Sequence, residues 1–100
     1  MPVSAKSLDS GNKIELIIQG RFDFNDHTAF RETYKAENPA AEYVVNMKQA
    51  EYLDSSALGM LLLLREHAGG EKAHISIINT PDNIMKIFRI SNFESLFNIA

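Results

Sequence analysis

The sequence predicts an α/β fold, with a mixed sheet of four to five strands and about four helices. Apolar, β-branched stretches alternate along the chain with stretches of helical character, and short polar connections join them. This alternation is typical of parallel strands joined by right-handed crossovers. The 100 residues, 45% of them hydrophobic, suffice for one core but not for a second domain. We therefore expect residues 1–100 to form a single domain.

Three strands and one helix are predicted in the first half of the chain. The strands cover residues 3–8, where the pattern is weak, and the stretches 13–19 and 43–47, which are rich in β-branched residues. Turn residues at 9–12 predict a hairpin between the first two strands, which adds one antiparallel pair to the sheet. Gly20 is expected to end the second strand. A helix over residues 27–36 follows, with Asn25 or Asp26 as its cap.

The second half of the chain predicts two helices and two strands. The helices cover residues 57–67 and 82–89, and the strands cover 74–78 and 97–99. Thr80 followed by Pro81 is typical of an N-cap with proline at the first helical position. Ser91 and Glu94 have the spacing of a capping box, which predicts one further helical turn before the last strand.

Composition and charge exclude several classes of function. Ten Lys and Arg against thirteen Asp and Glu give a net charge of −3 without a basic stripe, so direct nucleic-acid binding is not expected. The longest apolar run, 60–64, is far shorter than the roughly 20 residues that cross a bilayer, so membrane insertion is not expected either. The chain has no cysteine, and its start lacks the features of a secretion signal. These features predict a soluble, cytoplasmic protein.

The sequence contains no recognisable catalytic or metal-binding motif. His27, His67 and His74 fall on separate predicted elements without the spacing of metal ligands. No nucleophile elbow or phosphate-binding glycine-rich loop is present in the sequence. We therefore expect no metal and no cofactor, and the chain is predicted to be a substrate of enzymes rather than an enzyme.

The most informative stretch is 52–61, in which Asp54, Ser55 and Ser56 precede a nearly all-apolar helix. Ser at a helix start is an ordinary cap that contributes about 1 kcal/mol. A hydroxyl there can equally accept a phosphoryl group, because a helix N-terminus favours negative charge. Asp23 has a similarly simple alternative as a turn residue that binds its own backbone. Gly59 is interpreted as a position that lets the helix approach the sheet closely.

The run Asp54-Ser55-Ser56-Ala57-Leu58-Gly59 resembles the phosphoacceptor corner of the anti-sigma-factor antagonists, which are STAS-domain proteins. Gly20-Arg21-Phe22-Asp23 resembles a second segment of that family, whose Asp lies near the acceptor serine. The order of strands and helices agrees over nearly the whole chain. Ala57 departs from the family pattern, since many members have Gly there.

The resemblance implies a phosphorylation-controlled anti-sigma-factor antagonist in bacterial partner switching. Its expected partners are an anti-sigma factor or serine protein kinase, bound in the unphosphorylated state, and a metal-dependent serine phosphatase that restores binding. Ser55 is implied as the acceptor, with Ser56 as the alternative site or a structural cap, and Asp23 and Asp54 are implied as phosphosite neighbours. The implied partner-binding residues are Ala57, Leu58, Met60 and Leu61.

Two other functions remain open for this fold. A STAS subunit of a transport or lipid-handling complex would dock on another protein without obligatory phosphorylation. A STAS module that senses a small ligand would use the same corner differently. Because the fold is common to all three functions, the site has to discriminate between them. Met60 also has two possible positions, since it can face a partner or lie in the core.

Overall fold

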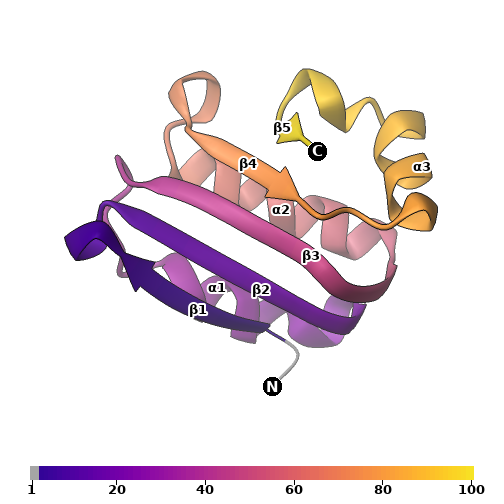
Figure 1. Ribbon diagram of the computed structural model, residues 1–100, viewed down its shortest axis with the longest axis horizontal. Coiled ribbons are helices and arrows are strands. Elements are labelled where there is room, and N and C mark those ends of the chain that lie inside the picture. Colours follow the sequence, from indigo (N-terminus) through magenta and orange to yellow (C-terminus); the bar gives the residue numbers. More distant parts are fainter. Residues whose placement is uncertain (1–2) are drawn as a thin grey trace.

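A five-stranded sheet in the order β1-β2-β3-β4-β5 forms the centre of the structure, a computed structural model that describes residues 3–100 (Figure 1). The strands are β1 (Val3–Leu8), β2 (Lys13–Phe22), β3 (Glu42–Leu53), β4 (Ile75–Ile78) and β5 (Asn98–Ile99). β1 pairs with β2 in antiparallel orientation, and all later neighbours pair in parallel. The predicted mixed sheet is confirmed.

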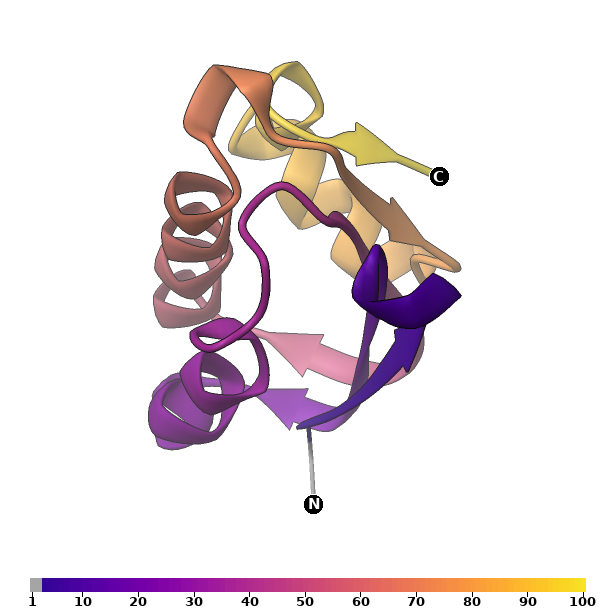
Figure 2. The ribbon, with the colours of Figure 1, turned by 90° about the vertical axis from the view of Figure 1, so that its left-hand side faces the viewer.

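Three α-helices accompany the sheet in the described residues, rather than about four. They are α1 (His27–Tyr34), α2 (Ser55–His67) and α3 (Asp82–Ile90). Figure 2 shows α1 and α2 together on one face of the sheet, whereas α3 connects β4 to β5. Short 3-10 turns occupy residues 9–11, 24–26, 70–72 and 93–95.

The core lies between the sheet and these helices. Alternate residues of each parallel strand point toward it, as the period of two in a strand requires. The buried side chains include Ile14, Leu16 and Ile18 of β2, Tyr43, Val45 and Met47 of β3, and Ile75 and Ile77 of β4. On the opposite face of the sheet, Asn46 donates a hydrogen bond to Glu15 (3.0 Å) and accepts one from Asn79 (3.2 Å). Ile17, Val44 and Ile78 lie on the same face, which is therefore of mixed polarity, whereas the core face is apolar.

β2 and β3 are both longer than predicted, and their shared end positions the site. Gly20 does not end β2, because it lies at a register irregularity opposite Ala50 with a φ of +67°. Glycine tolerates that backbone angle, so the strand bends there and continues. Phe22 and Leu53 then pair with each other, and both are buried. The apolar core thus extends to this edge of the sheet and holds the two strand ends together.

The caps predicted for α3 and for the turn after it are both wrong. α3 begins at the Pro81 carbonyl, which accepts hydrogen bonds from the N–H groups of Ile84 and Met85, so Thr80 is not its cap. Ser91 ends α3, and its hydroxyl donates to the Ile87 carbonyl at 2.8 Å. The further turn before the last strand does form, at Phe93–Ser95, but its N-cap is Asn92. Serine side chains bond preceding carbonyls as readily as following N–H groups, which makes spacing alone ambiguous.

Candidate functional site

The common end of β2 and β3 brings two predicted aspartates next to each other. The N–H of Asp54 donates a hydrogen bond to the carbonyl of Phe22 at 3.3 Å. Asp23 directly follows Phe22, and paired residues on neighbouring strands lie roughly 5 Å apart. The structure therefore places Asp23 beside Asp54, the arrangement that the sequence implied.

Asp54 is the N-cap of α2, a role that the sequence analysis assigned to Ser56. Its carboxylate accepts a hydrogen bond from the N–H of Ala57 at 3.0 Å, and its backbone is extended. Ser55 and Ser56 already belong to the helix. Because a capping residue needs a non-helical backbone, Ser56 cannot cap α2 in this conformation.

The two serine hydroxyls are left unused by the fold. Among residues 3–100, neither the hydroxyl nor the backbone N–H of Ser55 or Ser56 has a hydrogen-bond partner. Ser55 is exposed, whereas Ser56 is half-buried. Unpaired N–H groups at a helix start attract negative charge. Ser55 is therefore the more exposed of the two serines, at a helix start that favours negative charge.

Asp23 has the turn-residue role that the sequence analysis left open. Its carboxylate accepts a hydrogen bond from the N–H of Asn25 (2.9 Å), and its own N–H donates to the buried carboxylate of Asp26 (3.1 Å). Arg21 lies 3.7 Å from the other carboxylate oxygen of Asp23. This reciprocal capping fixes a 3-10 turn. The turn presents Phe24, whose exposed fraction is 68%, beside the site.

The outward face of α2 differs from the predicted recognition face. Ala57, Met60 and Leu61 are buried in the core, and Leu58 is half-buried against it. These positions, with Leu64, follow the helical spacing that packs on the sheet. The exposed residues of α2 are Ser55, Gly59, Leu62, Leu63 and Glu66. Leu62 and Leu63 were missed because the apolar run 60–64 gives no sign of which side faces the sheet.

Gly59 does not serve the close helix packing that the sequence analysis proposed. A Cβ built at this position would have no atom within 4 Å, and the residue is exposed. Glycine inside a helix costs about 1 kcal/mol relative to alanine. No contact within residues 3–100 accounts for that cost. Gly59 therefore leaves the helix backbone uncovered one turn after Ser55.

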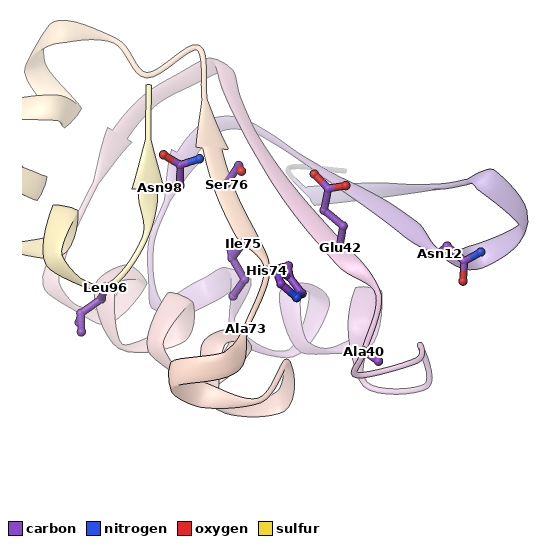
Figure 3. Close-up of a pocket in the computed structure, with 9 residues that line it drawn as sticks. All are labelled: Asn12, Ala40, Glu42, Ala73, His74, Ile75, Ser76, Leu96 and Asn98. Atoms are coloured by element: carbon purple, nitrogen blue, oxygen red, sulfur yellow. The ribbon is translucent and has the colours of Figure 1, made fainter.

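Two concave regions lie away from this corner. The larger, of about 530 Å³, gathers residues at the starts of β3, β4 and β5, at the opposite end of these strands from Ser55 (Figure 3). Its lining comprises Asn12, Ala40, Glu42, Ala73, His74, Ile75, Ser76, Leu96 and Asn98. The second, of about 380 Å³, lies between α1 and α2 and is lined by His27, Arg31, Tyr34, Lys35, Leu63 and His67.

Within residues 3–100, no three His, Asp or Glu side chains come together as possible metal ligands. None of the helices in the same range has the length and apolar character needed to cross a bilayer.

Comparisons with known proteins agree on the type of domain. A family model described as "Mlab, STAS domain" matches residues 8–98. A STAS-domain containing protein of Pseudomonas aeruginosa (strain UCBPP-PA14) is 52% identical over 102 residues, which cover 100% of this chain and 100% of that protein.

Solved structures show the same fold at low sequence identity. A proposed anti-sigma factor antagonist of Thermotoga maritima superimposes with a TM-score of 0.82 at 12% identity, over 97% of this chain and 84% of that one. The anti-sigma factor antagonist SpoIIAA in its unphosphorylated form gives a TM-score of 0.78 at 14% identity, over 98% of this chain and 87% of that one.

Proposed function

Because the chain belongs to the family of STAS-domain proteins, we propose that it is an anti-sigma-factor antagonist switched by phosphate on Ser55. One observation carries the proposal. Ser55 lies exposed on the first turn of α2, with an unused hydroxyl, beside two aspartates at the shared end of β2 and β3. A serine that served only as the helix cap would use its hydroxyl to accept a hydrogen bond from a backbone N–H of the first turn.

The switch works through charge on the outward face of α2. The unphosphorylated face, comprising Ser55, Gly59, Leu62, Leu63 and the adjacent Phe24, binds an anti-sigma factor or serine protein kinase. Phosphorylation adds a charge of about −1.5 to −2 to the exposed start of α2. Asp54 and Asp23 already place negative charge there, so the modified face repels an apolar or acidic partner surface. A metal-dependent serine phosphatase restores binding.

Phosphopeptide mapping tests the site. We expect the protein isolated from its own cell to carry one phosphate, on Ser55, that phosphatase treatment removes. Ser55→Ala should abolish the modification, whereas Ser56→Ala should leave it in place, because Ser55 is exposed and Ser56 is half-buried. Fragmentation mass spectrometry makes the assignment. Phosphate on Ser56, with Ser55→Ala modified normally, would contradict it.

Gly59→Ala separates a partner-binding role of this face from a structural one. Since a Cβ at Gly59 meets no atom of the chain, the variant should be more stable by up to about 1 kcal/mol in urea unfolding. The added methyl group should nevertheless weaken binding of the purified kinase or anti-sigma factor, because it holds the partner away from the helix backbone. A variant that gains stability and binds as well as the parent would remove Gly59 from the interface.

The polar region at the starts of β3, β4 and β5 favours one second candidate, a STAS module that senses a small polar ligand. Glu42, His74, Ser76 and Asn98 offer both donors and acceptors there (Figure 3). Native mass spectrometry of the protein purified from its own cell distinguishes the two candidates. A bound metabolite without phosphate on Ser55 supports the sensor, and phosphate without a metabolite supports the switch.

A further inference from the structure

The groove between α1 and α2 has a surface chemistry of its own. His27, Arg31 and Lys35 line its α1 side, and each lies four residues after the last, so the three form one stripe along the helix. Leu63 and His67, also four residues apart, line the α2 side. We propose that this groove binds an acidic segment of the partner protein that carries a large apolar side chain. The inference rests on the proposed function, because it describes that same partner.

The charges of the groove are the first argument. No Asp or Glu lines it, although the whole chain has a net charge of −3. Lys35 is partly neutralised by Glu32, whose carboxylate lies 2.8 Å from the Lys35 ammonium group. Arg31 is exposed and forms no ion pair within residues 3–100. A free guanidinium favours a carboxylate, which it can bind through two parallel hydrogen bonds.

The floor of the groove is already fixed. The rings of Tyr34 and His67 lie 5.0 Å apart, and the Tyr43 hydroxyl lies 3.2 Å from Nε2 of His67. Because the Tyr43 hydroxyl donates to the carbonyl of Asn38 at 2.9 Å, it must accept from His67, which assigns the proton to Nε2. Burial raises the pKa of Tyr43 to about 12, so this phenol stays protonated. Because these side chains are already held in place, little conformational entropy is lost there when a partner binds.

Exposed apolar side chains join the groove to the proposed partner face. Leu63, with an exposed fraction of 51%, belongs to both surfaces. Phe24 lies against His27 with ring centroids 5.8 Å apart. Ser55 precedes Leu62 by seven residues, or roughly 10 Å along α2. A partner that covers Ser55 can therefore extend into the groove, where Leu63 meets an apolar side chain and Arg31 a carboxylate.

A pair of synthetic peptides tests the inference without kinase or phosphate. The first is a 14-residue helical peptide with Glu and Leu on one face, and the second replaces every Glu by Lys. In NMR titrations of the whole ¹⁵N-labelled protein, the acidic peptide should shift the amides of His27, Arg31 and Leu63, whereas the basic peptide should not bind there.

Matched variants make the test specific. Arg31→Glu should weaken the acidic peptide by about tenfold or more, since it exchanges attraction for repulsion. Arg89→Glu, the same reversal on exposed α3, should have no effect. Leu63→Gln should also weaken binding, in contrast to Ile90→Gln, which alters an apolar residue that is 87% exposed elsewhere.

The groove and the proposed function can fail separately. Binding of an acidic segment in the groove would be contradicted by any of three results, even if phosphate on Ser55 still controls partner binding. The peptide does not bind or binds regardless of its charge, the shifted amides lie elsewhere, or Arg31→Glu leaves binding unchanged. Peptide binding in the groove of a protein that is never phosphorylated on Ser55 would overturn only the switch.

Discussion

Phosphate on Ser55 is expected to weaken binding of the kinase-like partner by tens to thousands of fold. An unpaired charge forced into a partly dry interface costs about 2 to 5 kcal/mol, which corresponds to that range of affinity. Ser55 is exposed on the first turn of α2 directly after Asp54, whose carboxylate adds to the negative charge of a phosphate instead of offsetting it. Calorimetric titration of both forms against the purified partner measures the effect.

Charge variants test whether this loss comes from the position of the phosphate. Ser55→Asp should reproduce only part of it, because one carboxylate has less charge and fewer acceptor oxygens than a phosphate. Ser4→Asp, which adds a carboxylate to exposed β1, is the matched control and should bind normally. Circular dichroism should stay unchanged on phosphorylation, since the helix start accommodates the charge. Equal partner affinities of the unmodified and phosphorylated proteins would contradict the phosphate switch.

The sheet was largely predictable from the sequence because its signals are local. β-branched apolar runs such as 43–47 indicate buried strands, and alternating helices imply parallel pairing. The ends of the strands were not predictable in this way. Lys48 and Gln49 of β3 are polar and exposed, and Gly20 is a poor strand residue, yet both regions are held in the sheet by pairing of β2 with β3. That pairing depends on the buried partner strand rather than on the local sequence.

The corner could be located from the sequence, but its outward face could not. Residue type and order drew attention to Asp54 and Ser55, whereas their role and the position of Asp23 beside them were implied by the family resemblance. The parallel pairing of β2 with β3 then places Asp23 beside Asp54. The side of α2 that faces the sheet could not be predicted, because Leu and Met at 60–64 occupy every side of the helix. Only its position against the sheet decides which of them are buried. The groove with Arg31 likewise requires α1 and α2 side by side, which no single segment encodes.

The orientation of α2 against the sheet predicts opposite effects for two substitutions. Met60→Glu should unfold the domain. Leu62→Glu should fold but lose partner binding. Met60 is 3% exposed within the core, while Leu62 is 38% exposed on the outward face. A carboxylate without a partner in an apolar core costs several kcal/mol, a large part of the roughly 5 to 15 kcal/mol that stabilises a domain. At Leu62 the carboxylate stays in water and costs little stability.

Urea unfolding followed by circular dichroism measures the first effect, and calorimetric titration with the partner measures the second. Met60→Leu, which keeps an apolar side chain of similar volume in the core, is the matched control and should stay within about 1.5 kcal/mol of the parent. If Met60→Glu instead keeps the parent's stability and loses only binding, Met60 faces the partner, and the packing of α2 against the sheet differs from the one described. If both Glu variants fold and bind normally, neither side of α2 at this level contacts the partner, and binding must rely on Phe24 and the start of the helix.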